Sequence, residues 1–133
     1  MSDAPYFLTK AHVFAIHRRV IDEFGGNPGV RDHGLLESAV RMPAARFAGV
    51  YLHDGIPAMA AAYLFHLCKN HAFMDGNKRV ALASAEVFLL LNERQLNATD
   101  DELEVLTVAV ASGRVSKQEV TEFFSDHVTP END

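Results

Sequence analysis

The stretch of this chain that most restricts its fold lies past the middle and is apolar on nearly every side. Between Val80 and Leu91, only Ser84 and Glu86 interrupt a series of valine, alanine, leucine and phenylalanine residues. The stretch is too short to span a bilayer, which takes about 20 apolar residues in a helix. A helix that is apolar nearly all round must be wrapped by other elements. The sequence therefore predicts a helix over residues 77–92 at the centre of an all-α protein.

The rest of the chain also shows the helical spacing of apolar residues. Helices are predicted at residues 10–24, 32–40, 57–70, 99–111 and 116–126. Their start signals are N-cap side chains, a proline in a first turn and two capping boxes, at Thr9, Asp32, Pro57, Thr99–Glu102 and Ser116–Glu119. The sum is a bundle of about six helices in one domain, residues 1–133, with frayed ends at 1–5 and 129–133.

Size and charge narrow the class of protein. The 133 residues suit one domain with one core, and the formal net charge is −6. An acidic chain lacks the general electrostatic attraction that DNA and RNA binders use, so we expect no direct nucleic-acid partner. Cys68 is the one cysteine, which rules out an internal disulfide, and no secretory signal pattern opens the chain. We therefore expect a cytoplasmic protein that does not enter a membrane.

The connection between the two inner helices carries the residues suited to chemistry. It reads HAFMDGNKR at residues 71–79, so Asn77, Lys78 and Arg79 form the first turn of the apolar helix. The start of a helix presents free N–H groups and the positive end of the macrodipole, and both favour anions. Gly76 allows a sharp turn and a close approach of the backbone to a ligand. These four residues predict a phosphate cradle.

Three further side chains belong to the predicted site. Asp75 lies beside the cradle, and a carboxylate next to phosphates is the usual way in which Mg²⁺ is held. Histidine is a common general base in enzymes, so His71 could take a proton from an incoming hydroxyl, a step worth about 10²–10⁴-fold in rate. Phe73 is apolar within a polar loop, so we expect it to anchor the loop to the core.

Each of these residues also has a purely structural interpretation. A histidine near a helix end is often a cap or a packed ring, and Asp-Gly-Asn alone is a turn. Against this, Lys78 and Arg79 are cations at the positive end of a helix, which is locally unfavourable. Such violations of local preference tend to occur at functional sites. The residues alone therefore leave open an anion site and an ordinary helix connection.

The same segment resembles a known family. HAFMDGNKR matches every defining position of the core motif of Fic/Doc proteins, written roughly H-x-F-x-[D/E]-[G/A]-N-[G/K]-R. Similar stretches at residues 24–26, 29–32, 35–39 and 88–92 extend the resemblance over about 7–124, toward the death-on-curing branch, and imply a Fic-fold helical bundle. The roles that it implies are general base for His71, Mg²⁺ ligand for Asp75, binding of ATP phosphates for Gly76, Asn77 and Arg79, and a structural role for Phe73.

Lys78 separates two branches of that family. Fic proteins that transfer AMP carry glycine at this position, whereas Doc-type proteins carry lysine. The resemblance implies that the lysine fills part of the phosphate pocket, so that the nucleotide binds in the reversed orientation. Lys78 is therefore expected to be catalytic, together with His71, and also to bind phosphate. The reaction is then transfer of the γ-phosphate of ATP to a threonine of a protein, expected to be elongation factor Tu, which blocks translation. An AMP-transferase and a non-catalytic binding module with this fold are the alternatives.

The resemblance also implies partners. Doc-type toxins are neutralised by a small Phd-type antitoxin whose C-terminal segment folds onto them. The family's autoinhibitory helix reads roughly [S/T]-x-x-x-E-[G/N], and this sequence contains no such string. We therefore expect any restraint on this protein to come from a separate antitoxin chain.

The stretch at residues 47–56 is predicted to be a loop or a small hairpin. Val50, Tyr51 and Leu52 have strand character, and an Asp-Gly turn pair follows them. In Fic proteins a hairpin at this place aligns the target by strand addition. The resemblance thus makes Tyr51 and Leu52 the expected target-docking residues.

The other titratable side chains are given structural roles. Spacings of five residues, from His12 to His17 and from His66 to His71, do not suit helical metal pairs, so no zinc site is predicted. Cys68 is expected to be a small core residue, and Glu86 to pair with a cation. The histidines expected on the surface or in packing are His12, His17, His33, His53 and His127.

Overall fold

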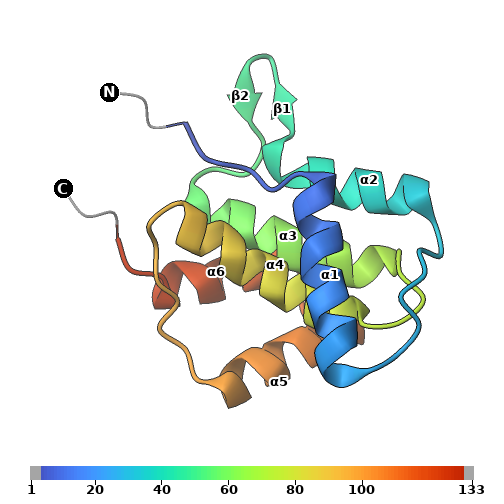
Figure 1. The fold of residues 1–133 in the computed structure, drawn as a ribbon. Helices are drawn as coiled ribbons and strands as arrows, with labels where there is room; N and C mark the ends of the chain where they lie inside the picture. The colour runs from blue at the N-terminus through green and yellow to red at the C-terminus, as the bar shows by residue number, and fades with distance from the viewer. Residues whose placement is uncertain (1–3, 131–133) are drawn as a thin grey trace.

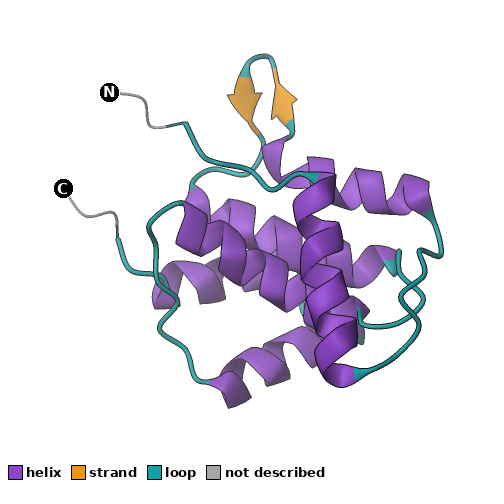
Figure 2. Cartoon of the chain, viewed as in Figure 1, coloured by secondary structure: helices purple, strands orange, loops and turns teal. Residues whose placement is uncertain are grey.

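The computed structural model describes residues 4–130 and consists mostly of helices (Figures 1 and 2). In chain order its elements are α1 (Lys10–Phe24), α2 (His33–Arg41), the short 3₁₀ helix η1 (Met42–Ala44), β1 (Arg46–Phe47), β2 (Val50–Tyr51), α3 (Ile56–Asn70), α4 (Asn77–Leu91), α5 (Asp100–Ala111) and α6 (Lys117–His127). The predicted all-α bundle of six helices is confirmed. No helix of the described residues is long and apolar enough to cross a membrane.

The predicted helix starts are confirmed in detail. The side chains that accept a hydrogen bond from the backbone N–H three residues on are Thr9, Asp32, Thr99 and Ser116. In α5 and α6, Glu102 and Glu119 reach back to the N-cap N–H and complete the capping boxes. In α1 the residue that reaches back is His12, through its ring nitrogen.

The centre of the bundle is shared by α3 and α4, and α3 is the more enclosed of the two. Helix α3 contacts α2, η1, α4, α5 and α6, and the alanines of its first half are buried and leave room for close packing. Helix α4 packs on α3 but keeps one side open, with Leu82 and Val87 half-buried and Leu90 exposed. Helix α4 is thus central as predicted, packed against α1, α3 and α5, while its remaining apolar side lines a cavity.

The predicted hairpin exists and stands apart from the helices (Figure 1). Arg46 pairs with Tyr51 and Phe47 with Val50 in antiparallel register. The Tyr51 ring lies 5.7 Å from the ring of Phe7, and its hydroxyl accepts a hydrogen bond from the Arg46 guanidinium at 2.7 Å. The hairpin is thus tied down at Tyr51, while Phe47 and Val50 are exposed.

The ends are more ordered than predicted where the structure describes them. The Thr129 N–H donates to the Gln95 carbonyl, and the Thr129 hydroxyl accepts from the Gln95 N–H. The prediction of a frayed Thr129 is therefore wrong, because these two hydrogen bonds tie it to the α4–α5 connection. The rest of the predicted fraying falls on residues 4, 5 and 130, which lie outside helices and strands, and on 1–3 and 131–133, which lie outside the described residues.

Candidate active site

The connection between α3 and α4 makes two sharp changes of direction. His71 ends α3 in the left-handed conformation, with φ 52°, and Gly76 precedes α4 with φ 80°. No side chain caps the start of α4, so the first N–H groups of that helix are free for a ligand. The missing Cβ of Gly76 faces α1, where it would meet Val20 and Ile21 at 3.3 and 3.4 Å. Glycine is therefore required here both by the backbone angle and by packing against α1.

The segment that follows α1 braces this connection along its length. The Met74 N–H donates to the Gly29 carbonyl, and the N–H groups of Arg31 and Asp32 both donate to the Ala72 carbonyl. The Arg31 guanidinium donates to the carbonyls of Asn70 and His71 at 3.1 and 2.7 Å. These bonds hold the backbone of His71 while its side chain stays exposed.

Asp75 is exposed, and one of its carboxylate oxygens is fixed. Its Oδ2 accepts a hydrogen bond from the Asn27 N–H at 2.7 Å. Gly26 lies so close that an added Cβ would be 2.9 Å from the Asp75 Cβ. No group of three or more metal-ligating side chains gathers within residues 4–130. An Mg²⁺ ion held by Asp75 would therefore need most of its ligands from phosphate and water, which is how Mg²⁺ is commonly bound.

The Asn77 side chain points into the protein and bonds to the loop backbone. The side chain accepts from the Phe73 N–H and donates to the Phe73 carbonyl, at 3.0 and 2.9 Å, and it is buried. The amide NH₂ has two N–H groups, and the bond to the Phe73 carbonyl uses one of them. Asn77 thus shapes the loop through two buried hydrogen bonds, and its binding of an ATP phosphate stays a prediction.

Phe73 is buried beneath the loop and lies between two rings of α1. Its ring stacks on that of His17, with centroids 3.7 Å apart, and meets the edge of Phe14 at 6.2 Å. His17 was expected either on the surface or in packing, and it is buried and packed.

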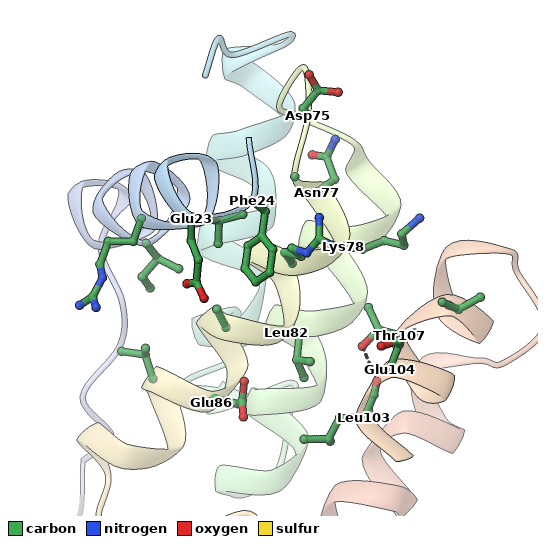
Figure 3. A pocket seen from close by; sticks show the side chains of 18 of the residues that line it. Glu23, Phe24, Asp75, Asn77, Lys78, Leu82, Glu86, Leu103, Glu104 and Thr107 are labelled. Atoms are coloured by element: carbon green, nitrogen blue, oxygen red, sulfur yellow. Dashed lines mark hydrogen bonds between the residues drawn. The ribbon is translucent and has the colours of Figure 1, made fainter. Parts of the chain in front are cut away.

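A cavity of about 1100 Å³ opens between α1, α4 and α5. At one end lie the residues of the predicted site, and Figure 3 shows Asp75, Asn77 and Lys78 there. Its other lining residues at that end include His71, Gly76 and Arg79, whose guanidinium carbon is 4.1 Å from the centre of the Phe24 ring. The structure thus brings together the His71 imidazole, the Asp75 carboxylate and the cations Lys78 and Arg79 around an uncapped helix N-terminus.

The opposite end of the cavity is apolar and acidic (Figure 3). Glu86 lies there on α4, with Leu103 and Glu104 of α5. Burial raises the pKa of the Glu86 carboxyl, and the nearby Asp100 carboxylate raises it further. Within residues 4–130 no cation forms an ion pair with Glu86, so the predicted pairing is wrong. The pairing of Glu86 could not be predicted from the sequence, because the sequence does not show which side chains from different helices meet across the cavity.

The remaining predicted residues lie elsewhere. Cys68 is buried in the core as predicted, and burial raises the pKa of its thiol. Tyr51 and Leu52 do not line the cavity; Leu52 is exposed, and Tyr51 is half-buried. Sequence reasoning missed Asn27, Arg31 and His17 as supports of the site. Asn27 and Arg31 lie beside and within stretches that resemble the family, and this resemblance could have indicated that they support the site.

Taken together, the fold and site define a mostly helical protein that presents an exposed histidine and a carboxylate at an uncapped helix N-terminus. The family model described as Fic/DOC family matches residues 7–89. The chain is 49% identical over 78 residues to Toxin Doc of Mycolicibacterium smegmatis (strain ATCC 700084 / mc(2)155), covering 59% of this chain and 60% of that protein. It is 35% identical over 115 residues to Protein kinase doc of Escherichia phage P1, covering 86% and 90%. The chain belongs to the Fic/Doc family.

Proposed function

We propose that this protein is a Doc-like toxin that transfers the γ-phosphate of ATP to a protein hydroxyl. The observation that carries the proposal is the exposed His71 beside the uncapped start of α4, with Asp75, Lys78 and Arg79 lining the same cavity. One relative, 35% identical over 115 residues, is named a protein kinase. The threonine of elongation factor Tu expected from the family resemblance is the proposed target.

In this reaction each residue has a distinct task. The His71 imidazole takes the proton of the target hydroxyl as the hydroxyl oxygen attacks the γ-phosphorus of ATP. The bond from that phosphorus to the β–γ bridging oxygen breaks, and ADP leaves with the bonding electrons. The Arg79 guanidinium, the Lys78 ammonium and the free N–H groups of α4 stabilise the negative charge of the transferred group. Asp75 would hold Mg²⁺, which supplies charge neutralisation on the phosphates when bound. The Arg31 bonds to the loop backbone keep His71 in place.

Lys78 supports phosphate transfer over AMP transfer. Its side chain is exposed at the mouth of the helix and lines the cavity, so it occupies space that glycine would leave free. That space is where the phosphates of a nucleotide in the AMP-transferring orientation would lie. The reversed orientation proposed from the family resemblance presents the γ-phosphate to the target.

The decisive experiment uses purified protein, elongation factor Tu and ATP labelled on either the γ- or the α-phosphate. Label from γ alone, with a mass gain of about 80 Da on the target, supports the proposal. Label from α, with a gain of about 329 Da, supports the AMP-transferase alternative. Absence of label from both, with growth inhibition in cells that survives loss of the His71 imidazole, supports a non-catalytic binding module.

The cavity extends beyond the residues of the phosphate cradle, which supports a second proposed partner. Small-molecule sites typically measure about 300–1000 Å³, and this cavity continues from the phosphate end into the apolar and acidic end. We propose that a segment of a small Phd-type antitoxin occupies that end and restrains the toxin.

Two valines of α5 offer a matched test of this docking. Val108 lines the cavity and is 41% exposed, whereas Val105 on the same helix is 69% exposed and does not line it. V108D should weaken binding of a co-expressed antitoxin by about tenfold or more, because it places a charge in the proposed interface. V105D should leave binding unchanged. Equal effects of the two variants would exclude this cavity as the docking site.

A further inference from the structure

His17 combines a stacked ring with a polar contact to the active-site loop. Its side chain is 2% exposed, and its ring lies nearly parallel to that of Phe73, with 12° between the planes. Its Nε2 is 2.8 Å from the backbone carbonyl oxygen of Asp75, a residue 58 positions along the chain. The contact therefore joins α1 to the peptide that links the proposed metal ligand to Gly76.

The hydrogen bond fixes which way this peptide faces. A carbonyl oxygen only accepts, so Nε2 must carry the proton. No described peptide bond is cis, and in a trans peptide the C=O and N–H point in opposite directions. Holding the Asp75 carbonyl toward His17 thus turns the Gly76 N–H away from it. A flipped peptide would replace that donor by an oxygen, which repels a phosphate at the helix start.

Packing alone does not explain a histidine at this place. Phe14 already gives Phe73 an aromatic neighbour, and a phenylalanine at position 17 would keep the stack without burying a polar N–H. A buried polar group costs free energy unless it is hydrogen-bonded. The imidazole is therefore accounted for by the bond to the Asp75 carbonyl, and not by the stack.

We infer that His17 is a positioning residue that holds the Asp75–Gly76 peptide in the orientation in which the start of α4 binds a phosphate. It acts through the loop and does not itself line the cavity. The inference rests on the proposed function only in naming that anion as a phosphate of ATP.

Two substitutions separate the bond from the stack. His17→Phe keeps the aromatic stack and removes the donor. His17→Gln removes the stack and keeps an amide N–H near the position of Nε2. His127 supplies a matched control, because its ring stacks on Phe123 at 4.0 Å and its Nδ1 contacts the Phe123 carbonyl at 2.7 Å, on a helix that does not line the cavity.

A positioning role predicts the order of activities. We expect H17F to lower kcat for phosphate transfer by about 10- to 100-fold, H17Q to retain most of it, and H127F to match the wild type. If H17F is as active as the wild type while H17Q is impaired, the role of His17 is packing and the inference is overturned. Should H17F fail to fold, H17Q decides: a kcat within about tenfold of wild type supports the inference, and a larger loss overturns it.

Amide hydrogen exchange tests the inference without any reaction. The Phe73 and Met74 N–H groups are bonded to Asn77 and Gly29, and they report on the loop. In H17F we expect both to exchange about tenfold faster, and in H127F to be unchanged. Unchanged exchange in H17F overturns the inference. If the wild type transfers no label from ATP, the proposed function is refuted but the inference about His17 is not. The exchange measurement then still decides whether His17 positions the loop.

Discussion

The active-site loop and the β1–β2 hairpin are both short connections, yet the fold holds them very differently. The loop is bonded on one side by the segment after α1, through Gly29 and Arg31, and below by Asn77 and His17. The hairpin is held at Tyr51, whose ring lies against Phe7 of the segment before α1, and its Phe47 and Val50 side chains are exposed. A site that stabilises developing charge benefits from groups fixed in advance. A surface that accepts a protein segment benefits from exposed apolar groups that can adjust.

The largest effect should come from His71, whose backbone is held by hydrogen bonds while its side chain is exposed. We expect His71→Asn to lower kcat for phosphate transfer by about 10²–10⁴-fold, because it removes the base. Asparagine is chosen because it tolerates the left-handed conformation that His71 adopts. Transfer of label from γ-ATP measures the loss. His33→Asn, on an exposed histidine of α2, serves as control. Activity of H71N near that of H33N would refute a catalytic role.

Two neighbouring glycines test how tightly the loop is held. Gly25 and Gly26 both have positive φ, but only at Gly26 would a Cβ collide with Asp75. We expect G26A to destabilise the loop by about 2 kcal/mol and to reduce Mg²⁺-dependent ATP binding. G25A should cost only the backbone strain, about 1 kcal/mol, and leave ATP binding unchanged. Calorimetric titration with a non-hydrolysable ATP analogue compares the two, and equal affinities would show that Gly26 does not support Asp75.

Structural features that depend on residues close together in the sequence could be predicted, whereas features that depend on contacts between distant residues could not. Helix starts were predictable because a cap such as Thr99 finds its partner three residues on. The inward turn of Asn77 requires the loop to fold back on Phe73, and the bond from His17 crosses 58 positions. The side of α4 that lines the cavity likewise depends on where α1 and α5 lie, so the apolar residues of α4 predict its central place but not the cavity. The motif therefore locates the site, while its supports come from the tertiary fold.

The base of the hairpin should be sensitive to pH. The Lys117 ammonium lies 3.0 and 3.1 Å from the Nε2 atoms of His53 and His66. Burial first, and then the Lys117 charge, lower the pKa of both imidazoles from 6.5, that of His66 to about 4. Both rings are thus neutral in the folded protein at pH 7, and each can accept a hydrogen bond from Lys117. Acid should weaken this attachment of the chain that leaves β2.

The sign of the effect follows from these shifts. Below pH 6.5 these two imidazoles bind protons in the unfolded chain but not in the folded protein. The free energy of unfolding should therefore fall as pH drops from 6.5 to about 4. We expect a loss of about 1–2 kcal/mol, measured by urea unfolding at pH 7 and 4.5. His66→Gln should flatten this dependence. Protonation of Glu86, whose pKa is raised, acts in the opposite direction in both proteins, so their difference isolates His66.

The smallest effect should come from the exposed apolar side chains of the hairpin. Phe47 is 76% exposed and has no part in the cavity, so Phe47→Ser should change the free energy of unfolding by less than about 0.5 kcal/mol. If the hairpin docks the target, KM for elongation factor Tu should rise about fivefold, because an apolar contact made on binding is lost. The affinity for ATP should stay unchanged, since the loop and the hairpin are supported separately. Tyr6→Ser, at another exposed aromatic residue, is the control. An equal KM for F47S and Y6S would remove the hairpin from target recognition, whereas a loss of ATP binding in F47S would show that the two regions are coupled.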